Sequence, residues 1–181
     1  MKKNKKVYTI CIASMMAALS IILDVLSVRT DSSKITLYSL PLLLSGFLFG
    51  PWVGLLSGLA SGLISQIILY GFSVTTPIWI IAPMLWGFLS GMLFHKAFKK
   101  REKLWVISLV VIITSISATL VNTLAIYLDG LIFNYPTPYV ITQLGIRILT
   151  SLGLSIAYIT LIYSILPSIK PLTDSSTHNA S

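Results

Sequence analysis

The sequence predicts an all-α integral membrane protein, built as a bundle of six transmembrane helices. Two observations lead to this fold class. Of the 181 residues, 55% are hydrophobic and only 10% are charged, and the mean hydropathy is +0.90. A soluble domain of this length needs more charge to cover its surface. In addition, apolar stretches of about 20 residues, long enough to span a bilayer, recur along almost the whole chain.

Breaks rich in glycine, proline and polar residues divide the apolar sequence into helices. Gly50–Pro51 marks one turn, because proline disfavours helix in the residue before it and suits the first turn of the next helix. The other breaks are RTDSSK (29–34), GFSVTTP (71–77), the basic segment around 100 and DGLIFNYPTP (129–138). The expected helices are Val7–Val28, Tyr38–Phe49, Trp52–Tyr70, Pro77–Phe98, Leu104–Asp129 and Pro138–Leu166.

The first two helices differ from a simple membrane span. The chain begins like a secretory signal peptide, but its apolar part continues to Val28 and further spans follow, so we expect a retained helix. The second helix has about 12 residues, or roughly 18 Å, which is short for a full span. It should therefore be embedded against other helices or continue into the third.

Small residues recur at four-residue spacing in the apolar segments. In lipid, such residues let helix backbones approach closely. One alternative is tight packing inside the monomer, which we favour for the glycines. The other is a surface for a partner helix, which we expect for Ala13 and Ala17 on the first helix. The glycines concerned are Gly46, Gly50, Gly54, Gly58, Gly62, Gly87 and Gly91.

The positive charges predict the orientation of the bundle. Ten lysines and arginines flank the membrane on the side of the termini, against two, Arg29 and Lys34, in the other loops. The positive-inside rule places both termini in the cytoplasm, so the basic net charge needs no nucleic-acid partner. We expect a multi-pass protein of the cell membrane, with one domain over residues 1–170 and a polar, disordered tail over 171–181. The ten residues are Lys2, Lys3, Lys5, Lys6, Lys96, Lys99, Lys100, Arg101, Lys103 and Lys170.

Strongly polar side chains inside the spans converge on the outer third of the bundle. Polar groups are costly inside a membrane and tend to be functional. From the helix rise, their depths below the outer ends are about 6 to 13 Å. They are Asp24, Gln66, Trp86, Asn122 and Arg147, with Gln143 one turn before Arg147. The pattern indicates an outward-opening cup lined by one cation, amides and indole rings.

Each member of this cup also has a structural interpretation. Arg147 can form an ion pair with Asp24 or Asp129, and the amides can join helices. Trp79 suits an interfacial position, whereas Trp86 lies too deep for one. The loop cations Arg29 and Lys34 are either solvated or face an anionic solute above the cup.

The motifs of several enzyme classes are absent from the sequence. It contains no phosphate-binding G-x-x-x-x-G-K-[ST] loop and no HExxH. His95 lies in the basic inner end of the helix expected over Pro77–Phe98 and His178 in the tail, so no histidine lies within the apolar part of a span to activate a serine nucleophile. No Cys/His cluster has the spacing of metal ligands. We therefore expect no enzyme activity, no cofactor and no metal, and a transport role would need a partner that supplies energy.

The membrane region, residues 7 to 166, resembles the substrate-binding S component of an energy-coupling factor (ECF) vitamin transporter. The features that carry the resemblance are the six helices, the basic start and Ala13-x-x-x-Ala17. KITLYSLPLLLSGFLFGPWVGLLSGLASGLI and TPIWIIAPMLWGFLSGML resemble the folate-type subfamily. In that subfamily a substrate-facing basic residue stands where this chain has Arg29.

The resemblance implies a high-affinity pocket on the outer face and a partner module of one transmembrane T subunit and two ATPases. It also implies delivery of the vitamin by toppling of the S component in the bilayer. Folate carboxylates would meet Arg29, Lys34 or Arg147, and the pterin would stack on Trp86 or Tyr70 and bond to amides such as Asn122 or Gln143. Two alternatives remain open, an S component for another vitamin such as pantothenate and a membrane scaffold without a ligand.

Overall fold

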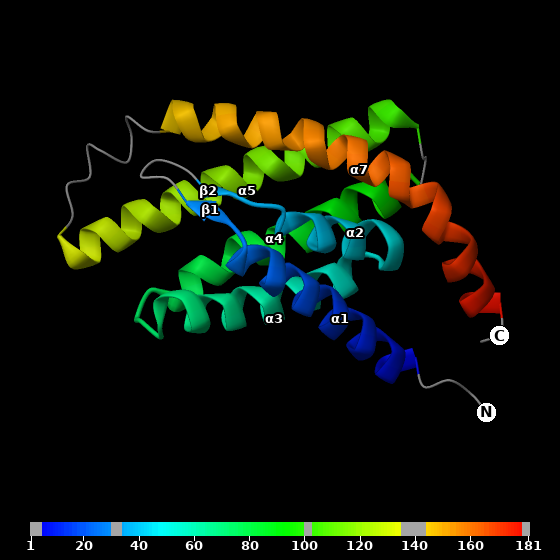
Figure 1. Cartoon of the computed structure of the whole chain (residues 1–181), viewed down its shortest axis with the longest axis horizontal. Coiled ribbons are helices and arrows are strands. Elements are labelled where there is room, and N and C mark those ends of the chain that lie inside the picture. Colours follow the sequence, from blue (N-terminus) through cyan, green and yellow to red (C-terminus); the bar gives the residue numbers. More distant parts are fainter. Residues whose placement is uncertain (1–4, 30–33, 100–102, 135–143, 179–181) are drawn as a thin grey trace.

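The computed structural model describes residues 5–29, 34–99, 103–134 and 144–178, and their helices lie side by side in one bundle (Figure 1). The six helices predicted from the sequence are all present. They are α1 (Lys5–Val25), α2 (Ser39–Phe49), α3 (Pro51–Tyr70), α4 (Thr76–Met92), α5 (Leu104–Phe133) and α7 (Leu144–His178). A five-residue π-helical turn, η1 (Leu93–Ala97), prolongs α4.

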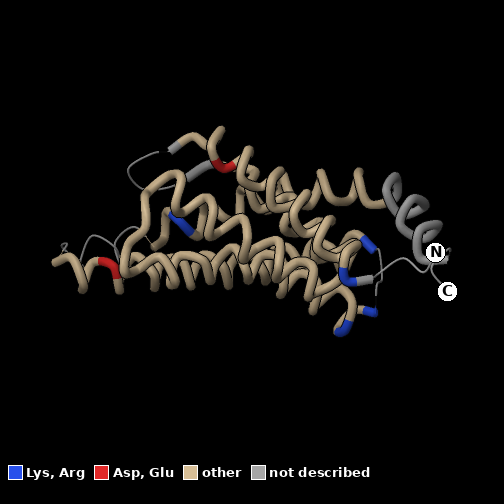
Figure 2. The backbone as a smooth tube through the Cα atoms, turned by 90° about the horizontal axis from the view of Figure 1, so that it is seen from below, with Lys and Arg blue, Asp and Glu red and all other residues tan. Residues whose placement is uncertain are grey.

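Five of the helical segments are long and apolar enough to cross a membrane, and these are Lys6–Val25, Pro51–Tyr70, Thr76–Ala97, Leu104–Phe133 and Leu144–Leu166. Figure 2 shows most of the lysine and arginine positions gathered at the end of the bundle where α1 begins, with the acidic positions and one basic position towards the other end. Apart from that one position, the basic residues drawn in Figure 2 lie on the side of the bundle where the chain begins, as the sequence predicts.

The short helix α2 lies at the centre of the bundle. Eight of its 11 residues are buried, and they include Leu42, Leu43 and Phe47. These side chains belong to one hydrophobic cluster with residues of α5 and α7, such as Val110 and Ile162. Burial on all sides explains why α2 is apolar around its whole circumference and why it does not need the length of a membrane span.

The turn between α2 and α3 lies at Gly50–Pro51, as predicted. Gly50 adopts a φ of 94°, a conformation that residues with a side chain rarely adopt. Pro51 is the first residue of α3, where its missing N–H leaves no helical hydrogen bond unmade. The break divides the glycine repeat between two helices.

Helices α3 and α4 pack directly through their backbones. A Cβ atom on Gly54 would overlap the backbone of Gly87, and one on Gly58 would overlap the backbone of Pro83 and Met84. Gly91 has the same relation to Pro51. The glycine spacing therefore serves tight packing within the chain, which is the alternative that the sequence favoured.

Two helix boundaries near the loops differ from the prediction. α1 ends at Val25, and Val28–Arg29 (β1) pairs antiparallel with Lys34–Ile35 (β2). The sequence did not predict this two-residue ladder. α5 continues through Gly130 to Phe133 and ends at Asn134, whose φ of 56° closes the helix in a left-handed conformation.

The last helix extends beyond its predicted end. Its predicted first residue, Pro138, lies outside the described residues, and α7 is described from Leu144. At the other end the helix continues past Leu166 to His178, through a segment where we expected a disordered tail.

Candidate functional site

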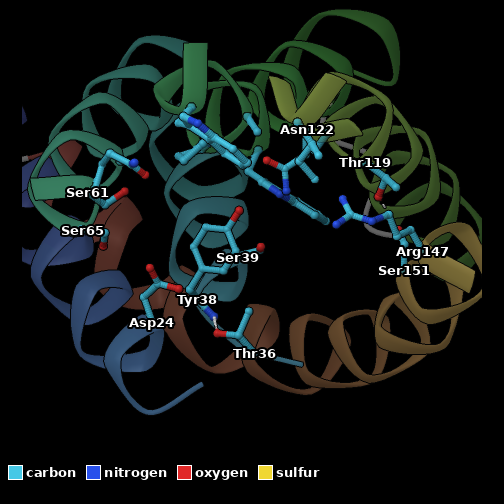
Figure 3. Close-up of a pocket in the computed structure, with 18 of the residues that line it drawn as sticks. Asp24, Thr36, Tyr38, Ser39, Ser61, Ser65, Thr119, Asn122, Arg147 and Ser151 are labelled. Atoms are coloured by element: carbon cyan, nitrogen blue, oxygen red, sulfur yellow. Dashed lines mark hydrogen bonds between the residues drawn. The ribbon is translucent and has the colours of Figure 1, made fainter. Parts of the chain in front are cut away.

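A cavity of about 670 Å³ lies at the ends of the helices that are remote from the start of α1. Its lining includes residues near the end of α1, α3 and α5 and near the start of α4 and α7. Side chains from all six described helices contribute to its wall, and Figure 3 shows several of them pointing into it. The cavity occupies the place where the sequence predicts the polar cup.

Most of the predicted binding residues line this one cavity. They are Gln66 and Tyr70 on α3, Trp79 and Trp86 on α4, Asn122 on α5 and Arg147 on α7. The convergence of these side chains from four helices agrees with the depths worked out from the helix rise. Their contact with a ligand remains a prediction.

The other predicted binding residues are placed less fully. The backbones of Arg29 and Lys34 face each other in the β1–β2 ladder, in the connection between α1 and α2. Gln143 lies outside the described residues, one position before the start of α7.

The wall formed by α5 and α7 carries a network of hydroxyl groups next to Arg147. The Ser115 and Ser151 hydroxyls lie 2.6 Å apart, and the Thr119 hydroxyl donates to the Ser151 oxygen at 2.9 Å. In Figure 3 the Arg147 side chain points into the cavity on this side, near Asn122. This wall therefore joins a cation to groups that both donate and accept hydrogen bonds.

The opposite wall carries an acidic residue on α1. Asp24 is 5% exposed and lines the cavity. Hydrogen bonds hold the segment before α2 next to the end of α1, where Asp24 lies. The Thr36 hydroxyl donates to the carbonyl of Leu23 at 3.1 Å and accepts from the Tyr38 N–H at 3.1 Å. The Ser20 hydroxyl also donates to the carbonyl of Tyr38 at 2.8 Å.

An aromatic pair lies deeper in the cavity wall. The rings of Trp86 and Tyr158 meet edge to face, with centroids 5.7 Å apart. The Tyr158 hydroxyl donates to the carbonyl of Thr36 at 2.7 Å. Tyr158 thereby connects α7 to the segment between β2 and α2, across 122 residues of sequence.

The structure corrects the predicted electrostatics of the site. Asp24 and Asp129 both line the cavity together with Arg147, so the described part of the lining is not cationic. Figure 3 places Asp24 and Arg147 on opposite sides of the cavity, which argues against an ion pair between them. Asp129 as a partner of Arg147 stays an open alternative.

Several lining residues were missed by the sequence analysis. Asp24 was located at the right depth, but it was interpreted only as a partner for Arg147. The hydroxyl residues gave little signal, because serine and threonine in a helix can bond to a carbonyl of their own helix. The missed residues include Thr36, Tyr38, Ser39, Ser61, Ser65, Ser115, Thr119, Ser151 and Tyr158.

The predicted docking residues Ala13 and Ala17 lie inside the bundle. They are 5% and 3% exposed, and they face the core on α1. In this conformation the bundle covers that face of α1, and contact of these two residues with a partner helix stays a prediction. The exposed small residues on α1 are Ser14 and Ala18, at the same four-residue spacing.

A bundle of apolar helices with a polar cavity near one end defines a membrane protein that binds a solute. The sequence model of one protein family, "ECF transporter, substrate-specific component", matches residues 8–169 of this chain. The chain belongs to this family. Its members are substrate-binding membrane proteins that take up a vitamin together with a T subunit and ATPase subunits, and ATP hydrolysis takes place in those partners.

Two solved structures share the fold. The S component of a bacterial ECF transporter is 20% identical, with a TM-score of 0.65 over 91% of this chain and 99% of that one. The S component for biotin from an ECF-type ABC transporter is 17% identical, with a TM-score of 0.62 over 92% of this chain and 95% of that one. No curated protein matches the sequence.

Proposed function

We propose that the chain is the folate-binding S component of an ECF importer. It captures the vitamin in the cavity on the outer face of the cell membrane, with both termini in the cytoplasm. A T subunit and two ATPases then complete transport, as the S component topples in the bilayer. The observation that carries the proposal is the cavity that brings Trp79, Trp86 and Arg147 together.

The size and the aromatic lining of the cavity suit a flat heterocycle. A volume of about 670 Å³ falls within the usual range for sites that enclose a small molecule, about 300 to 1,000 Å³. Indole and phenol rings offer faces on which a pterin can stack. Amide side chains at Gln66 and Asn122 can bond to the ring edge or to the central amide of folate.

Basic residues in the cavity wall and in the connection between α1 and α2 suit the glutamate tail of folate. Arg147 lies within the wall, and an arginine can hold a carboxylate through two parallel hydrogen bonds. Arg29 and Lys34 belong to the connection between α1 and α2, whose residues Thr36 and Tyr38 line the same cavity. Two carboxylates and up to three cations give the tail several partners.

The distribution of lysines supports the orientation. They gather at the end of the bundle opposite to the cavity (Figure 2), and the positive-inside rule assigns that end to the cytoplasm. The cavity then faces outwards, where a nutrient is captured.

Titration of folate into the detergent-purified protein tests the proposal. We expect saturable binding of folate and no binding of pantothenate, which has one carboxylate and no ring. Any small molecule that co-purifies with the protein should be identified by mass spectrometry in the same preparation. Binding of pantothenate, or of another vitamin, by a folded protein that does not bind folate would refute the folate assignment. Binding of no vitamin would favour a scaffold.

A further inference from the structure

The two polar walls of the cavity have opposite hydrogen-bonding character. Asp24 on α1 presents a carboxylate, which accepts hydrogen bonds when ionised. Arg147 on α7 presents a guanidinium, which only donates them. Figure 3 shows the two side chains on opposite sides of the same space, and both help to line it. A ligand that fills this space meets an acceptor at one end and a donor at the other.

The surroundings of each group reinforce the difference. Asp24 lies on the side of Tyr38, Ser61 and Ser65 (Figure 3), whose hydroxyls can donate or accept and so leave the carboxylate as the fixed acceptor of that wall. Arg147 lies on the side of Asn122 and the Ser115–Ser151 hydroxyl network. Arg147 attracts a carboxylate on the ligand and Asp24 repels it, while Asp129 on α5 also lines the cavity.

We propose that Asp24 recognises the donor edge of the ligand's ring, so that the ligand lies across the cavity with its ring towards Asp24 and its carboxylates towards Arg147. This proposal rests on the folate function proposed above and extends it to the orientation of the ligand. The chemical class that fits is a flat heterocycle with two neighbouring N–H donors at one end and an acidic tail at the other.

Folate has this arrangement of groups. The 2-amino group and the N3–H of its pterin are neighbouring donors, spaced to meet the two oxygens of one carboxylate. The glutamate tail carries the acceptors. An acidic residue in a site for a dianion is otherwise unfavourable, because like charges repel. Here it directs the tail away from α1, so that repulsion contributes to specificity together with attraction.

A ligand-side comparison on the parent protein tests the role of Asp24 without any substitution. The ligands are folate and an analogue in which hydrogen replaces the 2-amino group. Loss of a hydrogen bond to a charged group predicts at least about tenfold weaker binding of the analogue. Equal affinities of the parent protein for the two ligands would by themselves overturn the proposal.

The Asp24→Asn variant then assigns the discrimination to this residue. We expect its affinity for folate to fall about 30-fold or more, since a charge-assisted pair is lost. The preference for folate over the deamino analogue should fall to within about threefold of unity. Binding of p-aminobenzoylglutamate, which has the tail but no pterin, should stay within about threefold of the parent, and this also reports an intact cavity. If Asp24 only supported the fold, all three ligands would be affected alike.

Asp129→Asn is the matched control, because Asp129 is the other acidic residue among the described residues that line the cavity. It should change the affinities for folate and for the deamino analogue by the same factor. Loss of discrimination in this variant, with discrimination kept in Asp24→Asn, would overturn the proposal. Absence of folate binding by the folded parent protein would instead overturn the proposed function itself.

Discussion

Replacing Gly54 with alanine tests the direct contact between the backbones of α3 and α4. A Cβ atom at this position overlaps the carbonyl oxygen, the carbonyl carbon and the Cα atom of Gly87. None of these atoms ends a flexible side chain, so the two helices must move apart. Such overpacking costs about 3 kcal/mol, the upper end of the usual range. The better helix propensity of alanine returns about 1 kcal/mol. The net loss of about 2 kcal/mol predicts a melting temperature lower by roughly 4 to 8 °C.

Gly153→Ala in α7 is the matched control for this substitution. No atom lies within 4 Å of a Cβ placed at Gly153. The variant gains helix propensity without a clash, so its melting temperature should stay the same or rise by a few degrees. Thermal unfolding of both variants in one detergent, followed by tryptophan fluorescence, measures the difference. If Gly54→Ala melts at the same temperature as Gly153→Ala, the backbone contact does not limit the approach of these helices.

Three further predictions concern the connection between α1 and α2 and the inner face of α1. Tyr158→Phe removes the donor to the Thr36 carbonyl, which costs about 1 to 3 kcal/mol. The variant should release folate faster in stopped-flow measurements. An unchanged release rate would show that this hydrogen bond does not help to retain the ligand. Arg29→Ala should weaken folate binding about 30-fold or more, whereas an affinity within threefold of the parent would mark Arg29 as a solvated charge. Ala17→Trp should prevent folding of the isolated protein, because Ala17 is 3% exposed. Its neighbour Ala18 is exposed, so Ala18→Trp should fold. Equal yields of the two variants on size-exclusion chromatography would refute the inward placement of Ala17.

Hydrophobic patterning predicted the helices because the bilayer imposes a minimum apolar length on each span. The Gly50–Pro51 break was also predictable, since both residues restrict the backbone locally. The end of α5 was not. Gly130 remains helical and buried, and the helix ends instead where Asn134 adopts a left-handed conformation. Either residue can end a helix, and tertiary packing decides between them.

The site was predictable in part for a related reason. Depth along a helix follows from counting residues, so the convergence of Gln66, Asn122 and Arg147 could be worked out. The direction in which a helix faces could not. Small residues at four-residue spacing indicate close approach without naming the partner, so the sequence could not show that the bundle buries Ala13 and Ala17 in this conformation. Asp24 was interpreted only as a partner for Arg147, because one sequence does not show on which side of a cavity a charge lies.

The packing of α3 against α4 has a consequence for how the cavity opens. Glycine and proline backbones in contact contain no side-chain torsions that can rotate to absorb a displacement, so these two helices should move as one rigid body. The wall formed by α5 and α7 is different, because Ser115, Thr119 and Ser151 meet through hydroxyls that can exchange partners as α5 and α7 shift. We therefore expect the hinge for entry and release on the α5–α7 side. Hydrogen exchange should be faster there than in α3 and α4.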